Sequence, residues 1–165
     1  MKPAAQLTDN NKVDSIKLAD VRVLKRLFDQ ALRSDFTYFS EAYLDQVQRQ
    51  NSLTRLGVAS LRPDRLLLAL KVDQVLSGYV IAKLSRYDSA YIYWLFVKPE
   101  CRGRGLGNFL LNSALEVFAA HNIRRIELVT HDRKDFYIRH GFDVDQFRPK
   151  FIDGVDIYMM SRDMT

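Results

Sequence analysis

The sequence predicts an α/β (α+β) fold: a mixed central sheet of about six or seven strands, antiparallel in its first half and flanked by about four helices. Three apolar, strand-like runs at residues 66–72, 75–84 and 91–97 follow one another through short connections, which favours antiparallel pairing. Gly78, inside the second run, indicates a bulge or a close backbone approach. A helical pattern then separates the third run from a buried-type strand at residues 126–130. Strand, helix and strand in that order indicate one parallel β-α-β crossover.

Composition indicates one folded domain. The chain has 165 residues, of which 47% are hydrophobic and 27% are charged, a mixture typical of globular chains. We expect residues 1–14 to be a flexible N-terminal segment and residues 15–165 to form a single domain. The one cysteine excludes an internal disulfide and fits a reducing, cytoplasmic location. The first residues lack the apolar segment of a secretory signal, and no run is long enough to span a membrane.

Two helices are expected ahead of the strands. A short strand at residues 16–18 leads to Asp20, whose side chain can cap a helix by accepting a hydrogen bond from a first-turn amide. Five apolar residues then recur at the spacing of one helical face: Leu24, Leu27, Phe28, Ala31 and Leu32. Ser40 can cap a second helix that extends to about Gln50 and ends before Gly57.

The second half of the chain contains the crossover helix, a short helix and a closing strand pair. An apolar stripe at helical spacing over residues 110–119 predicts the crossover helix. A short helix at about residues 133–140 stops at Gly141. Residues 142–147 and 155–160 are expected to form the terminal pair of strands.

The most informative segment lies between the third strand and the crossover helix. Gly103, Gly105 and Gly107 alternate there, and glycines let the backbone adopt positive φ and approach a ligand closely. The first amides of the following helix lack intrahelical partners and, with the helix dipole, favour an anion such as a phosphate. Arg102 and Arg104 add positive charge that a plain turn would not require. The pattern therefore predicts a site for a phosphate-type anion.

Several common site motifs are absent from the sequence. The dinucleotide fingerprint GxGxxG fails because Asn108 stands where the third glycine belongs. Neither a GxxxxGK[ST] P-loop nor a GxSxG nucleophile elbow occurs. The net charge of +5 favours an anionic partner, but without a basic stripe or a binding motif we expect no nucleic acid. The histidines and the cysteine have no recognised metal-ligand spacing, so no metal is expected.

Two motifs in this region resemble those of the GNAT superfamily of N-acetyltransferases. Residues 102–107, RGRGLG, match the R/Q-x-x-G-x-G/A signature, and Pro99 and Glu100 lie just upstream as in the family. Residues 136–142, FYIRHGF, are similar to the downstream F/L-Y-x-x-x-G-F element. The element order over roughly residues 15–160 also resembles the GNAT fold. The resemblance implies an acyltransferase with acetyl-CoA as co-substrate and an amine acceptor, either a small molecule or a protein amine.

The resemblance also implies which residues hold the cofactor. The amides of the glycine loop would bind the pyrophosphate, and the end of the preceding strand would pair with the pantetheine arm like an added β-strand. The strand after the crossover would splay away to leave room for that arm. The cofactor-binding residues implied in this way are Leu95, Phe96, Val97, Arg102, Gly103, Arg104, Gly105, Leu106 and Gly107. A homodimer is compatible with the family.

Tyr137 matches the family position of the general acid that protonates the leaving sulfur. A tyrosine, with a reference pKa near 10, is protonated at neutral pH and can donate. The general base is open, because the strand at residues 91–97 lacks the glutamate that many relatives carry. Alternation would place Tyr91, Tyr93 and Leu95 on one face, so that either tyrosine could pass the proton through ordered water. Four other groups stay open as bases: Asp35, Glu41, Asp88 and His131.

Two interpretations of function also stay open. An aromatic run lies among carboxylates, which would suit a cationic amine or simply pack a helix onto the sheet. The residues of this run are Phe36, Tyr38, Phe39 and Tyr43, with Asp35, Glu41 and Asp45. The missing strand glutamate keeps a non-catalytic acyl-CoA-binding sensor or regulatory module as the alternative to an enzyme. Cys101 is interpreted as a turn cysteine and not as a nucleophile.

Overall fold

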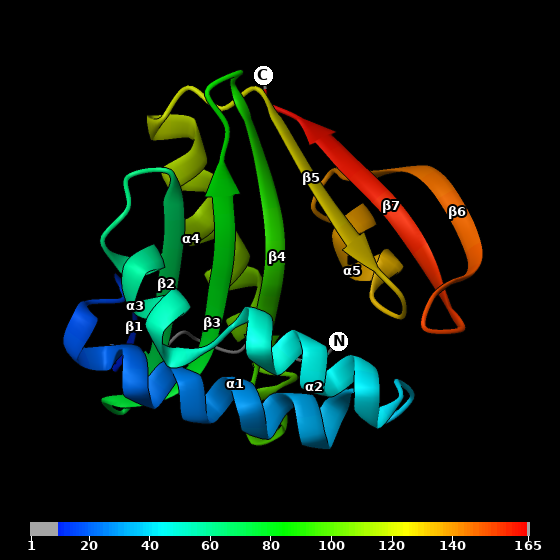
Figure 1. The fold of residues 1–165 in the computed structure, drawn as a ribbon. Helices are drawn as coiled ribbons and strands as arrows, with labels where there is room; N and C mark the ends of the chain where they lie inside the picture. The colour runs from blue at the N-terminus through cyan, green and yellow to red at the C-terminus, as the bar shows by residue number, and fades with distance from the viewer. Residues whose placement is uncertain (1–9, 165) are drawn as a thin grey trace.

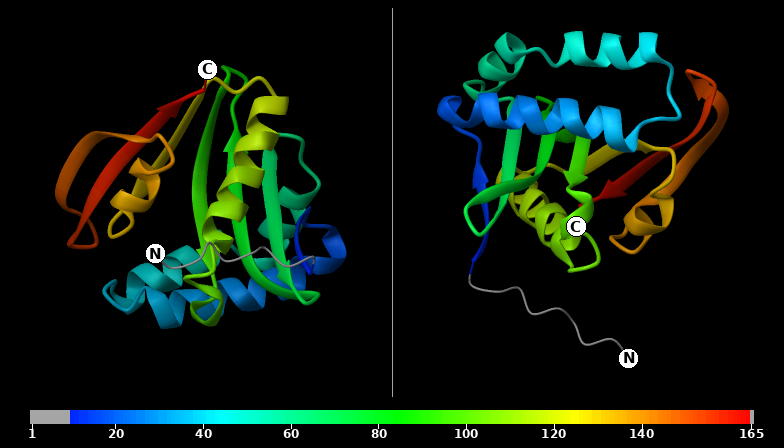
Figure 2. Two further views of the ribbon diagram at one scale, coloured as in Figure 1. Left: turned by 180° about the vertical axis from the view of Figure 1, so that it is seen from behind. Right: turned by 90° about the horizontal axis from the view of Figure 1, so that it is seen from below.

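The computed structural model describes residues 10–164, which form a seven-stranded mixed sheet with helices against both faces (Figures 1 and 2). The strands lie in the spatial order β1-β2-β3-β4-β5-β7-β6, and β4 and β5 are the one parallel pair among them. The strands are β1 (Asn11–Ser15), β2 (Arg65–Val72), β3 (Val75–Leu84), β4 (Ser89–Val97), β5 (Arg125–Thr130), β6 (Asp143–Ile152) and β7 (Val155–Asp163). The α-helices are α1 (Val21–Asp35), α2 (Glu41–Gln50), α3 (Leu53–Ser60), α4 (Leu106–Ala120) and α5 (Lys134–Ile138). The predicted fold class, including the single crossover, is confirmed.

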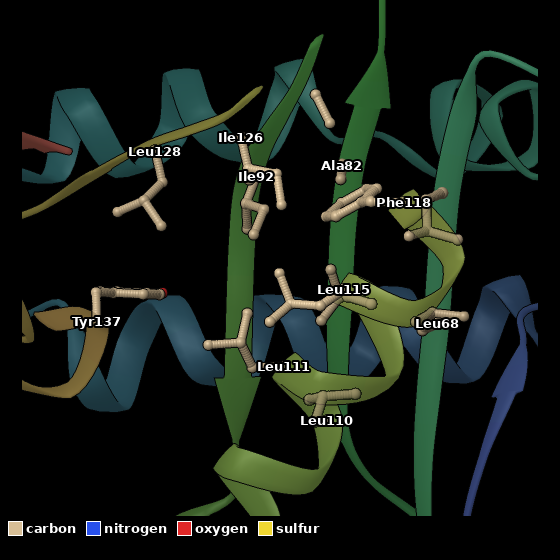
Figure 3. Packing of buried hydrophobic residues seen from close by; sticks show 14 of the residues in the cluster. Leu68, Ala82, Ile92, Leu110, Leu111, Leu115, Phe118, Ile126, Leu128 and Tyr137 are labelled. Atoms are coloured by element: carbon tan, nitrogen blue, oxygen red, sulfur yellow. The ribbon is translucent and has the colours of Figure 1, made fainter. Parts of the chain in front are cut away.

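Helices cover the two faces of the sheet with separate cores. On one face α4 contributes Leu110, Leu111 and Phe118, all fully buried, which pack over the middle of β2, β3 and β4 (Figure 3). On the other face α1 buries its predicted stripe, including Leu24 and Phe28, against the opposite side chains of the same strands. Burial of both faces explains why these strands are nearly continuous apolar runs. Among residues 10–164, none of the helices is long and apolar enough to cross a membrane.

The N-terminal third differs from the expectation in two places. β1 begins at Asn11 and pairs antiparallel with the end of β2, so part of the segment expected to be flexible is a strand, and no strand forms at residues 16–18. The helix α3 is also unexpected, because Gly57 indicates a break in the sequence pattern. Ser52 caps α3 by accepting a hydrogen bond from Arg55 N–H, and Leu56 anchors it in the core. These two contacts outweigh the low helix propensity of one glycine.

Gly78 lies where the backbone of β3 passes close to the backbone of β4. The β2–β3 register shifts between Leu70 and Lys71, opposite Gly78, as expected for a bulge. A Cβ at this position would lie 2.6 Å from the carbonyl oxygen of Phe96. The glycine therefore permits the close approach that aligns β3 with the last residues of β4.

A second irregularity lies in β4 itself. Ile81 pairs with Trp94 while the next residue of β3, Ala82, pairs with Ile92, so Tyr93 is an extra residue in β4. An extra residue of this kind reverses the alternation of side chains beyond it. The expectation that Tyr91, Tyr93 and Leu95 share one face is wrong for Leu95, which packs against the core under α4.

β4 and β5 separate after a short stretch of pairing. Four residue pairs join them, from Ser89 with Arg125 to Ile92 with Leu128. Beyond this point β4 continues to Val97 along β3, whereas β5 diverges with β7 and α5 (Figure 1). The predicted splaying of the strand after the crossover is present. Its consequence is that the last residues of β4 have no strand partner on the β5 side.

The C-terminal hairpin of β6 and β7 extends the diverging half of the sheet and is longer than the predicted pair of strands. Its turn is tied to the N-terminal half, because the backbone N–H and the hydroxyl of Ser40 both donate to the carboxylate of Asp153. Ser40 is also the N-cap of α2, as predicted, and accepts a hydrogen bond from Tyr43 N–H. The start of α2 and the hairpin turn are therefore held against each other.

Candidate active site

A cavity of about 320 Å³ opens where β4 and β5 diverge. It is lined by the unpaired end of β4, by the end of β5 and the residues after it, and by α5. Leu95, Phe96 and Val97, the strand residues implied to hold the pantetheine arm, all line this cavity, as does Arg102. A slender extended molecule could therefore lie along the free edge of β4, as an added strand does.

The glycine loop follows at the end of β4 and leads into α4. Gly103 and Gly105 have φ of 73° and 75°, and nothing lies within 4 Å of a Cβ built on either. Gly107 differs, because it has no positive φ and a Cβ on it would lie 3.6 Å from the ring of Phe136. Leu106 is 1% exposed, so only its backbone can reach a ligand. The loop thus presents open backbone at the start of a 15-residue helix, a favourable place for a phosphate.

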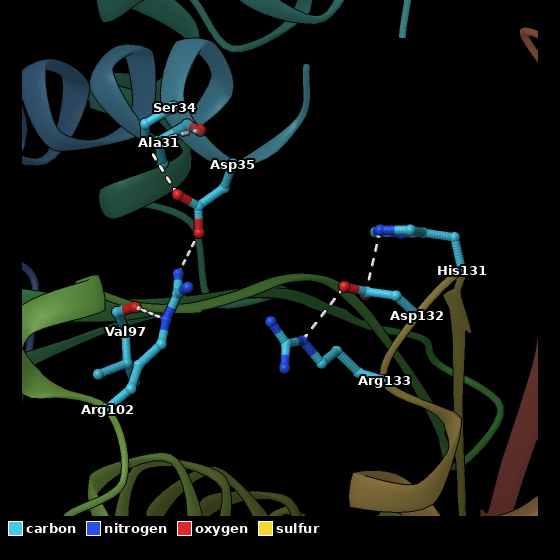
Figure 4. A network of polar contacts seen from close by, with 8 residues as sticks. All are labelled: Ala31, Ser34, Asp35, Val97, Arg102, His131, Asp132 and Arg133. Atoms are coloured by element: carbon cyan, nitrogen blue, oxygen red, sulfur yellow. Dashed lines mark hydrogen bonds and ion pairs between the residues drawn. The ribbon is translucent and has the colours of Figure 1, made fainter. Parts of the chain in front are cut away.

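Arg102 does not extend its charge freely into the loop. Its Nε donates to the carbonyl of Val97 at 2.9 Å, and its terminal nitrogen pairs with the carboxylate of Asp35 (Figure 4). The guanidinium also lies 5.5 Å from the centre of the Phe96 ring. The expected contribution of Arg102 to an anion site is therefore largely neutralised by Asp35. Its side chain fixes the end of β4 against α1, while Arg104 is exposed.

Tyr137 lies on α5 and borders the same cavity. It is 8% exposed, and its hydroxyl points from α5 toward β4 (Figure 3). The rings of Phe136 and Phe142 hold it from two sides through edge contacts. Burial, with a smaller contribution from the charge of Asp132, raises the pKa of Tyr137 far above its ordinary value. The phenol therefore stays protonated and is able to donate.

A second, larger cavity of about 680 Å³ lies between the sheet and the helices α2 and α3. Its lining includes the aromatic residues Phe36, Phe39 and Tyr43 of the run singled out in the sequence. It meets the first cavity at a set of residues that line both: Phe36, Tyr93, Trp94, Val129, Thr130 and His131. The two cavities therefore adjoin at these residues.

The carboxylates expected beside the aromatic run do not line the larger cavity. Asp35 lines the smaller cavity and is paired with Arg102. Glu41 and Asp45 are exposed on α2 and line neither cavity. The interpretation of this run as a cage of carboxylates for a cationic amine is wrong in that respect, because helix α2 turns its acidic residues to solvent.

Tyr91 and Tyr93 line the larger cavity, with their ring centres 4.9 Å apart. Burial raises the pKa of Tyr91, and the nearby Tyr93 and Glu127 raise it further. Tyr91 is therefore a neutral phenol at ordinary pH and cannot itself act as a base. Passage of a proton through water at these residues stays a prediction.

His131, one of the four open base candidates, occupies the junction of the two cavities at the end of β5. Its Nδ1 lies 3.2 Å from the hydroxyl of Tyr38. Its Nε2 lies 3.0 Å from a carboxylate oxygen of Asp132 (Figure 4). The ring is surrounded by Phe36, Tyr38 and Phe39. Burial lowers the pKa of His131, against the opposing effect of Asp132. The imidazole is therefore neutral near pH 7 and able to accept a proton.

The other three base candidates are less well placed. Asp35 is engaged by Arg102, and Glu41 points to solvent. Asp88 lies in the β3–β4 turn beside Arg124, at the opposite end of β4, and lines neither cavity. Sequence spacing alone could not rank these groups, because His131 and its partner Tyr38 are 93 positions apart.

The family model of the "Acetyltransferase (GNAT) family" matches residues 25–142 of this chain. The chain belongs to the GNAT acetyltransferase family. The resemblance noted in the two sequence motifs is thereby confirmed. A 67-residue segment is also 37% identical to an uncharacterized N-acetyltransferase of Methanocaldococcus jannaschii, covering 38% of this chain and 30% of that protein. The chain therefore spans less than a third of that relative in the match.

Solved GNAT structures share the fold over nearly the whole chain. PaiA N-acetyltransferase from Thermoplasma acidophilum, in complex with coenzyme A, has a TM-score of 0.79 at 22% identity, covering 93% of this chain and 99% of that one. YncA, a putative acetyltransferase from Salmonella typhimurium with acetyl-CoA, has a TM-score of 0.74 at 18% identity, covering 95% of both chains. The ribosomal-protein-S18-alanine N-acetyltransferase from Escherichia coli has a TM-score of 0.73 at 16% identity, covering 94% of both. These neighbours support the GNAT fold.

Proposed function

We propose that this GNAT protein transfers an acetyl group from acetyl-CoA to a primary amine by direct attack of the amine on the thioester. The observation that carries the proposal is the meeting of two cavities at His131 and Trp94. One cavity runs along the free end of β4 as far as Arg102, just before the glycine loop, and suits an extended coenzyme. The other is larger and suits an acceptor. Attack at the junction requires no covalent enzyme intermediate.

The residues of the smaller cavity fit coenzyme A. Open backbone at Gly103 and Gly105, with the start of α4, would receive the pyrophosphate. The unpaired end of β4 would hydrogen-bond the pantetheine arm. Bound there, acetyl-CoA supplies the thioester carbonyl that the amine attacks. Backbone N–H groups near Leu95 and Val97 would stabilise the negative charge that develops on the carbonyl oxygen.

Two protons move in this reaction, and two groups of the chain would take part. The amine forms its new bond to the carbonyl carbon and loses a proton, while the carbon–sulfur bond breaks and the sulfur gains one. Tyr137 would donate the proton to sulfur, since its hydroxyl is held protonated in the smaller cavity. His131 would receive the proton of the amine, since its imidazole is held neutral at the junction.

The route to His131 would run through the hydroxyl of Tyr38. The charge of Asp132, 3.0 Å from Nε2, would favour a proton on that nitrogen although no hydrogen bond joins the two groups. A proton on Nε2 would leave the lone pair of Nδ1 facing Tyr38. Burial and the nearby Asp132 and Asp35 raise the pKa of Tyr38, so its phenol keeps its proton and can act as a relay. Tyr38 would then accept from the amine as it donates to Nδ1.

A ligand-binding and turnover experiment tests the proposal. We expect acetyl-CoA to raise the melting temperature of the protein, because a ligand that binds the folded state stabilises it. We expect free CoA to be released when a suitable amine is added, and release to fall sharply in Tyr137→Phe. Absence of a thermal shift at millimolar acetyl-CoA would contradict the proposal. Stabilisation without CoA release from any amine would favour the non-catalytic acyl-CoA sensor.

A further inference from the structure

The larger cavity carries an unexpected balance of charge for an amine site. Three arginines line it, Arg55 from α3, Arg62 from the following loop and Arg65 from β2, whereas none of its lining residues within 10–164 is a carboxylate. A site for a polyamine or another multiply charged cation would require the reverse, because like charges repel and buried cations need anionic partners. The cavity therefore disfavours an acceptor whose charge is wholly positive.

Two of these arginines have their charge available. Arg62 is held by both oxygens of Asp64, at 2.7 and 2.9 Å, and is therefore neutralised. Arg55 and Arg65 form no ion pair of 4 Å or less with any carboxylate in the described part of the chain. Arginine presents a planar fork of donors that matches a carboxylate, and such charge-assisted pairs are stronger than neutral hydrogen bonds.

Two further carboxylates that act on residues lining the cavity are engaged elsewhere. Glu127, on the strand next to Tyr91, is bonded by Arg125. Asp153, near Tyr43, accepts two hydrogen bonds from Ser40. They contribute negative potential, but neither lines the cavity or pairs with Arg55 or Arg65. At the α3–β2 end, Asp64 pairs with Arg62 and also interacts electrostatically with Arg65, so the charge of the three arginines is only partly cancelled.

The arginine end and the reactive end of the cavity are separated along the sheet. Arg65 pairs with Lys83 of β3, whereas Trp94, at the junction of the cavities, pairs with Ile81. Two residues of β3 span about 7 Å, which is roughly the length of two extended peptide residues. Between the two ends the wall is apolar and aromatic, and it includes Ile81 and Tyr91.

We propose that the acceptor is a small primary amine with an apolar or aromatic body and a carboxylate about 7 Å from its nitrogen, as in a dipeptide, and that Arg55 and Arg65 bind the carboxylate. The amine then lies at the junction beside His131 and Trp94, and the body of the acceptor contacts the aromatic wall. This inference rests on the proposed acetyl transfer and specifies its acceptor by charge and length.

The test compares acceptors that differ in one charge. CoA release is measured for the dipeptide Ala-Phe, for its C-terminal amide, for free L-phenylalanine and for spermidine. We expect kcat/KM for Ala-Phe to exceed that for its amide by about tenfold or more, because a charge-assisted hydrogen bond is stronger than a neutral one. Free phenylalanine, whose amine and carboxylate share one carbon, should be a poorer acceptor than Ala-Phe. Equal rates for acid and amide, or a preference for spermidine, would overturn the inference.

Substitutions identify the groups responsible. Arg55→Gln and Arg65→Gln should each lower kcat/KM about tenfold for Ala-Phe and much less for its amide, because they remove the charge that distinguishes the acid from the amide. Arg49→Gln is the control, since Arg49 is exposed on α2 and lines neither cavity. If both arginine variants keep the full preference for the acid, the assignment of these residues is wrong.

The same experiment separates failure of this inference from failure of the proposed function. Turnover of the amide or of spermidine, without turnover of Ala-Phe, would leave acetyl transfer standing and would reject the carboxylate-bearing acceptor. Absence of CoA release from every amine, including these four, would reject both. Binding of Ala-Phe to the CoA-saturated protein, seen as a further rise in melting temperature that Arg55→Gln abolishes, provides a readout that does not depend on turnover.

Discussion

Tyr38 and His131, which belong to opposite halves of the chain, meet at a distance of 3.2 Å between the phenol oxygen and Nδ1. The contact joins the segment after α1 to the end of β5, and both residues border the cavity between the diverging strands. The carboxylate of Asp132 lies 3.0 Å from Nε2 without forming a hydrogen bond to it. The contact with Tyr38 therefore leaves Nδ1 as the imidazole nitrogen that is engaged by a hydrogen-bonding group at the cavity.

His131→Gln should reduce kcat for acetyl transfer by about 10²–10⁴-fold, because loss of a positioned general base costs a factor of this size. The affinity for acetyl-CoA should change little, since glutamine preserves much of the volume at the junction. CoA release and thermal stabilisation by acetyl-CoA measure the two effects. His121→Gln is the control, because His121 is exposed at the end of α4 and lines neither cavity. Equal losses in both variants would exclude His131 as the base.

The dependence of activity on pH should reflect the titration of the His131 imidazole. A base accepts a proton only when it is unprotonated, and burial lowers the pKa of His131. As pH rises, kcat/KM should therefore increase through a midpoint below the ordinary value of about 6.5 and then level off with respect to this group. In His131→Gln this acid-side limb should disappear. A limb that persists unchanged in the variant would assign it to another group.

Tyr137→Phe should slow the release of CoA by about 10²–10⁴-fold, because the sulfur would leave as an unprotonated thiolate. Burial raises the pKa of Tyr137 above the ordinary value of about 10, so the native enzyme should show no loss of activity from this group up to that pH. Tyr87→Phe, at a tyrosine that is 90% exposed, is the matched control. If Tyr137→Phe kept the native kcat, the side chain of Tyr137 would serve only for packing and not as the general acid.

Gly105→Ala should weaken acetyl-CoA binding by about tenfold or more, equivalent to about 1.4 kcal/mol. The residue has φ of 75°, and the open space beside it would receive the new methyl group where a phosphate must approach. Gly154→Ala is a close control, since Gly154 has φ of 76° and equally open surroundings but lies in the β6–β7 turn. Both variants carry the same backbone strain, so only Gly105→Ala should lose affinity in a titration. Equal affinities would exclude the loop as the phosphate site.

Gly78→Ala should destabilise the fold by about 1–3 kcal/mol, because the new Cβ would lie 2.6 Å from the Phe96 carbonyl and force the backbones apart. Gly57→Ala is the opposite case. Its Cβ would make an ordinary 3.5 Å contact with Leu18 inside helix α3, so stability should rise by about 0.5–1 kcal/mol. Unfolding by denaturant measures both, and a neutral Gly78→Ala would mean that β4 can shift without cost.

Patterns of neighbouring residues explain why much of the sheet and the start of α2 are predictable, whereas Asp20 precedes α1 without the expected cap hydrogen bond. Two of the predictable features are the Ser40 cap of α2 and the turn at Asp73 and Gln74 between β2 and β3. Each is predictable because it depends on a few adjacent residues. The helix α3 is not predictable in this way, since the burial of Leu56 that offsets the low helix propensity of Gly57 depends on packing against distant segments. The same holds for the bulge at Tyr93, because its position is set by pairing with β3.

The candidate site is predictable where it consists of a continuous motif and not where it is assembled by folding. The glycine loop and Tyr137 lie within matched segments; Tyr137 lines the smaller cavity, and the loop follows the strand whose end lines it. The role of Arg102 is not predictable, since its partner Asp35 belongs to α1. The sequence cannot rank His131 above Asp88 as the base. Only the folded structure places His131 at the junction of the two cavities and Asp88 at the far end of β4.

Only four residue pairs join β4 to β5, so the rest of β4 has no strand partner on that side and forms an edge in the middle of the sheet. Open ladders of this kind invite other strands and promote association between molecules, which proteins normally prevent by covering them. A bound coenzyme would close this ladder. The concentration of coenzyme would then affect how slowly the protein aggregates as well as how fast it catalyses its reaction. Storage of the purified protein with coenzyme A should accordingly extend its shelf life.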